Sequence, residues 1–205
     1  MRLLIAILTG LGLSASAGLR PFLPALLTGA LAGADAEFDV AGGHVGVDFD
    51  GTDFAFLESG VFLLIVLVLL VGAIVAQRRF GIAAVEGGPL GAALSGIAIA
   101  FGAVLFAGAL DEDGYAWWPG LIAGGAIAAL GQAAVRSLFG RIRARADRAV
   151  SEALVAYQDG GSLIGAAVAI FVPPLSLVVV ALLGWLYVGG RRRQGEKYAG
   201  LRILR

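Results

Sequence analysis

The stretch LLIVLVLLV, residues 63–71, contains only Leu, Ile and Val. It is the centre of an apolar segment that extends from Phe54 to Ala76. A helix of about 20 apolar residues crosses the hydrocarbon core of a bilayer. A helix on the surface of a soluble protein would instead carry polar residues along one face. The stretch therefore predicts a transmembrane helix.

The composition of the whole chain agrees with a membrane protein. Of its 205 residues, 59% are hydrophobic and 15% are charged, whereas soluble domains carry roughly 25% charged residues. Glycine occurs 32 times, and in membrane helices it lets backbones approach closely. We expect an all-α, polytopic transmembrane bundle in residues 1–190, followed by a polybasic cytoplasmic tail in residues 191–205.

Four other apolar stretches extend over residues 3–34, 81–110, 119–138 and 150–190. The first and the last are too long for one untilted crossing. Residues 150–190 contain two adjacent prolines, which favour a turn because neither continues a helix. This region then forms either two short crossings or a re-entrant hairpin. The chain is expected to have about six membrane segments, several of them discontinuous or re-entrant.

Glycine and proline mark where helices are expected to break within these stretches. Glycine has no Cβ, and proline has no N–H and clashes with the preceding turn. Irregular backbone at membrane depth is tolerated only inside protein or against a water-filled cavity. The expected break positions are Gly18, Pro21, Pro24, Gly87, Gly88, Pro89, Pro173 and Pro174.

The charged loops predict an orientation. Residues 35–53 contain six acidic residues and residues 111–118 contain three, and neither segment contains Lys or Arg. Basic residues gather instead at residues 78–79, 136–148 and 191–205. Basic loops stay on the cytoplasmic side during insertion. We therefore expect the acidic loops outside and, since Arg2 is also basic, both termini in the cytoplasm.

Three charged residues lie within apolar stretches, namely Arg20, Glu86 and Asp159. A charge at the bilayer centre costs at least about 2.5–3.5 kcal/mol. In one interpretation the two carboxylates lie near the interface and Arg20 caps a kink. In the other, Arg20 and a carboxylate line a polar site for an ion or a lipid headgroup. We expect Arg20 to pair with Glu86 first and with Asp159 second.

The sequence offers no pattern for catalysis or for metal binding. Cys is absent, His44 is the single His, and no nucleophile or phosphate-loop motif occurs. We expect no enzyme activity, catalytic residue, metal or cofactor. The expected partner is the lipid bilayer, and nucleic acid is not expected.

Four pairs of glycines have the spacing that allows close helix packing, either within the chain or between copies in a homo-oligomer. These pairs are Gly29/Gly33, Gly87/Gly91, Gly120/Gly124 and Gly161/Gly165.

Residues 14–24, SASAGLRPFLP, resemble the start of a family of bacterial integral membrane proteins known as domain of unknown function 4126. Its members begin with a helix of small residues, a Gly-Leu-(Asn or Arg) break, an aromatic residue and Leu-Pro. Phe54–Ser59 and Gly88–Gly91 are also similar to the family. Many relatives carry an acidic cluster where this chain has Arg78 and Arg79. The resemblance implies a bacterial inner-membrane protein and supplies no established activity.

Two functions fit these features. The first is a small channel or carrier for an ion or small solute, in which broken helices line a polar site. The second is a membrane component that organises lipids or partner proteins without transport. Convergence of Arg20, Glu86 and Asp159 on one site would favour the first function.

Overall fold

The computed structural model describes residues 1–34, 38–40, 43–81, 85, 88–143 and 148–199. These residues form an all-α bundle with one short two-stranded ribbon, which confirms the predicted fold class. The helices are α1 (Arg2–Leu19), α2 (Phe22–Ala32), α3 (Gly60–Phe80), α5 (Pro89–Asp111), α6 (Trp118–Arg143), α7 (Arg148–Phe171) and α8 (Ser176–Ala199). Shorter elements are β1 (Phe38–Val40), β2 (Gly43–Val45) and the 3-10 turns η1 (Ala55–Glu58) and η2 (Pro173–Leu175).

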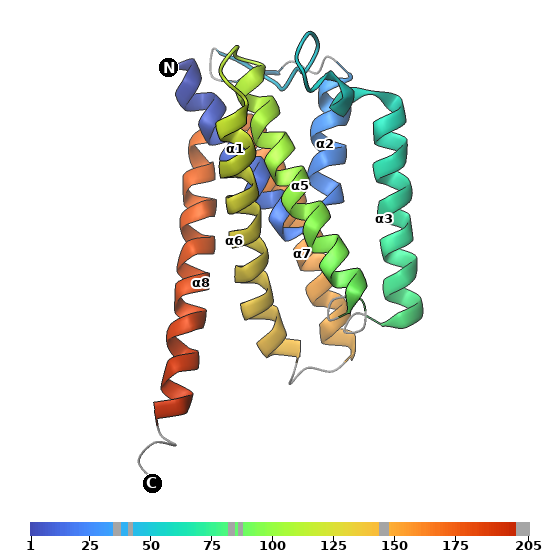
Figure 1. Cartoon of the computed structure of the whole chain (residues 1–205), viewed down its shortest axis with the longest axis vertical. Coiled ribbons are helices and arrows are strands. Elements are labelled where there is room, and N and C mark those ends of the chain that lie inside the picture. Colours follow the sequence, from blue (N-terminus) through green and yellow to red (C-terminus); the bar gives the residue numbers. More distant parts are fainter. Residues whose placement is uncertain (35–37, 41–42, 82–84, 86–87, 144–147, 200–205) are drawn as a thin grey trace.

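Helices α3, α5, α6, α7 and α8 run between the two ends of the bundle (Figure 1). We call one end the acidic end, because it holds residues 46–59 and the turn of residues 111–115. The opposite end is the basic end, where α3 finishes with Arg78 and Arg79. The two acidic loops therefore lie together, as their charges predicted.

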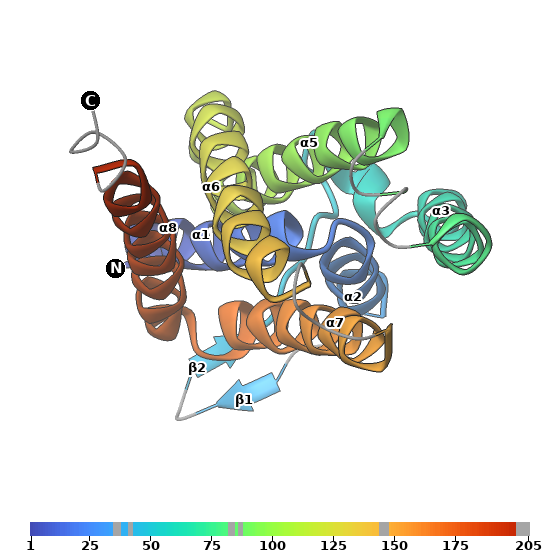
Figure 2. The ribbon, with the colours of Figure 1, turned by 90° about the horizontal axis from the view of Figure 1, so that it is seen from below.

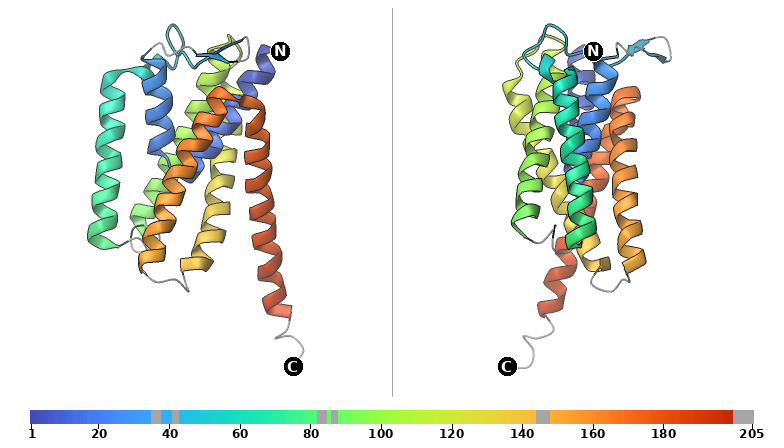
Figure 3. Two further views of the ribbon diagram at one scale, coloured as in Figure 1. Left: turned by 180° about the vertical axis from the view of Figure 1, so that it is seen from behind. Right: turned by 90° about the vertical axis from the view of Figure 1, so that its right-hand side faces the viewer.

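Helices α1 and α2 form a re-entrant hairpin. α1 starts at the acidic end, runs inclined into the bundle and stops at Leu19, and α2 returns to the acidic end (Figures 1 and 3). The first apolar stretch thus contributes two helices and no net crossing. The sequence predicted both termini on one side of the membrane, whereas in the bundle Met1 is at the acidic end and α8 finishes at the basic end.

Proline and arginine set the geometry of the hairpin tip. Arg20 is extended, with φ −149° and ψ 122°, as expected for a residue that precedes proline. Pro21 is the N-cap of α2, and Pro24 lies in its first turn. Pro24 was expected to break a helix, but the first turn tolerates proline because its N–H groups have no partner within the helix. The break is therefore confined to residues 20–21.

The end of the chain forms two antiparallel helices. α7 finishes at Phe171, and Pro173-Pro174 form η2 at the acidic end before α8 begins. α7 is helical through the adjacent glycines Gly160 and Gly161. α8 continues to Ala199, so the expected domain boundary at residue 190 does not end the helix.

The expected break before α5 is only partly described. Gly88 is the N-cap of α5 and Pro89 is its first residue, where the fixed φ of proline suits a helix start. Gly87 lies outside the described residues.

Helix α1 lies at the centre of the bundle and contacts α5, α6, α7 and α8; Figure 2 shows it between α6 and α7. Small residues allow this close packing. A Cβ at Gly18 would lie 2.4 Å from the carbonyl oxygen of Ala128, and one at Gly12 would lie 2.5 Å from the Cβ of Ala169. Of the expected glycine pairs, Gly120 and Gly124 both pack on α5. Gly29 and Gly33 pack on residues 57 and 58.

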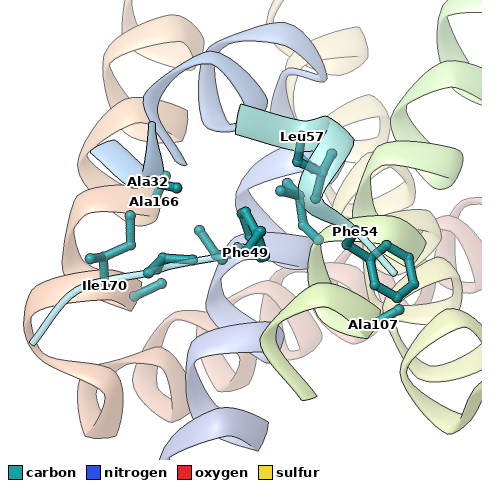
Figure 4. Packing of buried hydrophobic residues seen from close by; sticks show 12 residues of the cluster. Ala32, Phe49, Phe54, Leu57, Ala107, Ala166 and Ile170 are labelled. Carbon is teal, nitrogen blue, oxygen red and sulfur yellow. The ribbon is translucent and has the colours of Figure 1, made fainter. Parts of the chain in front are cut away.

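A cluster of buried apolar side chains closes the acidic end. Phe49 is fully buried in the middle of this cluster, with Ile170 on one side and Leu57 on the other (Figure 4). Gly108 makes room for it, since a Cβ there would lie 2.7 Å from the Phe49 ring. The segment after the β-ribbon is therefore anchored in the bundle by its aromatic residue.

The outer surface of the bundle is apolar, as a lipid-facing surface must be. In α3 only Val66 is buried, while Val61 and Val68 are 71% and 62% exposed. Among the described residues, five helices are long and apolar enough to cross a membrane: α1, α3, α5 and the apolar parts of α6 and α7. The chain is thus an integral membrane protein.

Gly124 and its neighbour Gly125 provide a matched test of the packing. A Cβ at Gly124 would lie 2.3 Å from the carbonyl oxygen of Gly102, whereas at Gly125 the nearest atom is 3.5 Å away. We expect Gly124→Ala to destabilise the protein by about 1–3 kcal/mol through overpacking. Gly125→Ala should be neutral or stabilising, because Ala favours a helix by about 1 kcal/mol over Gly. Thermal unfolding in detergent measures both, and equal midpoints for the two variants would contradict the packing.

Candidate functional site

An ion pair lies at the tip of the re-entrant hairpin. The Nε atom of Arg20 is 2.7 Å from Oδ1 of Asp159 in α7. Asp159 lies about halfway along α7, twelve residues before Phe171, which places it roughly 18 Å from that end of the helix. The pair therefore lies near the middle of the bundle.

The structure thus confirms that Arg20 is inside the bundle with a carboxylate partner. The partner is Asp159, the second candidate. Glu86, the first candidate, lies outside the described residues, and Val85 beside it is buried with 1% exposure. The Arg20 side chain is 17% exposed and that of Asp159 is 41% exposed. The carboxylate is therefore the more accessible member of the pair.

The carbonyl groups that end α1 are hydrogen-bonded at the tip. The Arg20 N–H donates to the carbonyl oxygen of Ser16 at 3.1 Å. The hydroxyl of Ser162, one turn after Asp159, donates to the carbonyl oxygens of Ser16 at 3.2 Å and of Arg20 at 3.4 Å. Two side chains of α7 therefore hold the tip, one by charge and one by a hydroxyl group.

The start of α2 adds positive potential to the same place. A helix N-terminus carries roughly half a positive charge, and the first turn of α2 contains no acidic residue. Arg20 adds a permanent charge. The negative charge of Asp159 balances the positive charge of Arg20 and the partial positive charge at the N-terminus of α2. A carboxylate is therefore favourable opposite the tip.

A second polar cluster joins α5 and α6 nearer the basic end. Arg136 Nη2 donates to the Ser95 hydroxyl, and Gln132 Nε2 donates to the Ser95 carbonyl oxygen at 3.3 Å. From the sequence, Arg136 served only to predict which loops are cytoplasmic, and this cluster was not predicted. The available signal was the spacing of Gln132 and Arg136, because residues four apart share a helix face.

The acidic end is held by carboxylates that accept backbone hydrogen bonds. Asp48 N–H donates to Glu112 Oε1 at 3.1 Å, and Asp53 N–H donates to Asp111 Oδ2 at 2.9 Å. Partial burial of its carboxyl group and the charges of Asp113 and Asp48 raise the pKa of Glu112 to about 7, against the lowering effect of the Asp48 N–H. Among the described residues, no three His, Cys, Asp or Glu side chains gather as metal ligands would.

The energy of the ion pair can be measured with a double-mutant cycle. Arg20→Gln leaves Asp159 without its partner, and breaking a buried pair costs about 3–5 kcal/mol. Because Asp159 is 41% exposed, we expect about 1–3 kcal/mol for either Arg20→Gln or Asp159→Asn. The double variant should lose less than the sum of the two. Additive losses in chemical unfolding would show that the pair contributes nothing.

The chain was also compared with known proteins. No curated protein and no solved structure matches it. The family described as "Domain of unknown function (DUF4126)" matches residues 7–193, a range that includes the hairpin, the ion pair and nearly all of the bundle. The chain therefore belongs to the DUF4126 family.

Proposed function

We propose that this protein transports a small solute or ion across the membrane, and that Arg20 and Asp159 form its binding site. The observation that carries the proposal is their ion pair at the tip of a hairpin that ends halfway through the bundle. Charged residues at this depth usually mark ion or substrate pathways. Half-helices that meet at the membrane centre commonly form the binding sites of transporters.

The distribution of polar groups supports access from the basic end. Ser95, Gln132 and Arg136 supply hydrogen-bonding groups between the ion pair and that end. Toward the acidic end, the packed cluster around Phe49 and Leu13 fills the bundle with apolar side chains. This arrangement supports a state of the transporter that is closed at the acidic end.

The charges at the tip favour a negatively charged solute. Arg20 stays charged at any physiological pH, and the N-terminus of α2 adds to its potential. One carboxylate, Asp159, faces both. An anion that displaces the Asp159 carboxylate would occupy a place already built for negative charge.

For the orientation, we propose that the basic end is cytoplasmic and the acidic end is outside, in a bacterial inner membrane. Basic segments remain in the cytoplasm during insertion, and Arg78, Arg79 and Arg136 all lie toward the basic end. Because the hairpin returns to its starting side, the N-terminus is then outside and the C-terminus is inside.

Cysteine labelling of intact cells tests the orientation, since the chain has no Cys of its own. Asp113→Cys, at the acidic end, and a cysteine inserted after Met1 should both react with a membrane-impermeant maleimide. Phe80→Cys, exposed at the end of α3, should react only after permeabilisation. Protection of the inserted cysteine together with labelling at position 113 would contradict the hairpin.

Transport is tested with purified protein in proteoliposomes, using a panel of small inorganic and organic anions and the matching cations. Wild type should move at least one anion. Arg20→Gln should abolish this flux, while Arg20→Lys retains part of it because the charge remains. Asp113→Asn, which lies outside the bundle, is the matched control and should transport at the wild-type rate.

Two results would overturn the transport proposal. One is a folded Arg20→Gln variant that transports as fast as wild type. The other is the absence of flux for every solute with folded wild type, which would favour a membrane component that organises lipids or partners. Movement of cations alone would refute the anion preference and keep the transport function. Size-exclusion profiles and thermal midpoints must show that each variant is folded.

A further inference from the structure

A single segment covers the acidic end of the bundle. It comprises residues 47–57, which we call the strap, and it contains no helix or strand before the 3-10 turn η1. Its buried apolar side chains share one cluster with side chains of α1, α2, α5 and α7, and they are Val47, Phe49, Phe54 and Leu57. Phe49 lies in the middle of this cluster (Figure 4). Movement of the strap away from these contacts would therefore uncover the bundle at this end.

Carboxylates hold the strap in place by accepting its backbone hydrogen bonds. Asp111, at the end of α5, accepts from the Asp53 N–H at 2.9 Å. Glu112, the next residue, accepts from the Asp48 N–H at 3.1 Å. Glu58, just after the strap, accepts a third N–H at 3.4 Å. Neither the strap nor the turn after α5 contains Lys or Arg. The strap is therefore held across a group of like charges, and its hold depends on how many of them are ionised.

Glu112 is the member of this group that titrates near neutral pH. Partial removal of its carboxyl group from water, with the charges of Asp113 and Asp48, raises its pKa from the ordinary value of 4.5 to about 7, although the Asp48 N–H lowers it. Among the described residues, the charges that act on it are thus Asp113 of its own turn and Asp48 of the strap. When the strap opens, water reaches the carboxyl group and the pKa returns toward 4.5. The closed strap keeps a proton that the open strap releases, so closure weakens as the pH rises from 4.5 to about 7.

We infer that the strap is a proton-sensitive cover, which closes the acidic end when Glu112 is protonated and loosens when Glu112 is ionised. A protonated carboxyl group still accepts the Asp48 N–H through its carbonyl oxygen, and it does not repel Asp48 and Asp113. An ionised carboxyl group keeps the hydrogen bond, but both aspartates repel it and it loses contact with water.

The inference stands apart from the transport proposal, because no group of the ion pair takes part in it. The orientation proposed above places the strap outside the cell, where it responds to the external pH. Opening of the strap itself is measured on the purified full chain, where orientation and transport have no influence.

Thiol labelling of one cysteine in the strap measures how often the strap opens. Val47→Cys changes the side-chain volume little, and Val47 is 4% exposed, so a water-soluble maleimide reacts there only when the strap opens. Each rate is divided by the rate for Phe80→Cys, an exposed position, at the same pH, which removes the pH dependence of the thiol itself. We expect this relative rate to rise about tenfold between about pH 5 and pH 7.5. The change in the pKa of Glu112 sets an upper limit of about 300-fold, and its partial exposure to water reduces the effect.

Variants of the Val47→Cys chain assign the titrating group. Glu112→Gln is neutral at every pH, and its amide oxygen still accepts the Asp48 N–H, so its relative rate should stay at the low-pH value of the parent. Asp48→Asn removes one of the charges that act on Glu112 and should reduce the rise. Asp50→Asn is the matched control, since Asp50 lies in the strap without acting on Glu112, and it should keep the full rise. His44→Gln should keep it as well, although an imidazole ordinarily titrates in the same range.

The inference is wrong if the parent chain labels at one rate throughout, or more slowly as the pH rises. A rise that Glu112→Gln retains, or that His44→Gln or Asp50→Asn abolishes, would also refute it, because another group would then control the strap. If Val47→Cys does not fold, Ala107→Cys replaces it, since Ala107 is fully buried in the same cluster. Thermal midpoints establish that each variant is folded.

Discussion

A backbone that stops being helical in the middle of a membrane must satisfy its own polar groups, because hydrocarbon offers no partner. The turn between α1 and α2 meets this requirement in two ways. Ser162 and the Arg20 N–H satisfy carbonyl groups that α1 leaves open. Pro21 and Pro24 lack the N–H groups that the start of α2 would otherwise leave without a partner. The hairpin can therefore end inside the bundle.

This requirement explains the dense packing around the hairpin. Hydrogen bonds to the tip are possible only if α6 and α7 approach α1 closely, and the glycines allow that approach. At Gly18 and Gly102 even a single methyl group would meet atoms of α6 within 2.5 Å. Ser14 adds a hydrogen bond of 2.7 Å from its hydroxyl to the Gly102 carbonyl oxygen, which links α1 to α5 near the tip. Small size and short polar side chains thus work together along α1.

The sequence predicted those features that depend on local chemistry. Long apolar runs identified α3 and α5 to α7, and Gly18-Leu19-Arg20-Pro21 identified the break. It did not predict that the first stretch returns to its starting side, because an apolar helix of 18 residues has the same composition whether it crosses the membrane or runs inclined into the bundle and stops there. α7 is helical through Gly160 and Gly161, because glycine inside a helix costs only about 1 kcal/mol relative to alanine. The spacing of Gln132 and Arg136 places both on one face of α6, but local spacing does not identify Ser95 of α5 as their partner.

The hairpin also has a consequence for the order in which the protein assembles. Arg20 and Asp159 are 139 residues apart in the chain, and the contact of Gly18 with Ala128 spans 110 residues. The ribosome makes the hairpin before α7, so the groups that neutralise its charge and satisfy its carbonyls are made more than a hundred residues later. The tip of the hairpin therefore lacks these partners until α7 has entered the membrane. Until then Arg20 must remain near water or near the insertion machinery, and closure of the bundle around the tip is coupled to the insertion of α7.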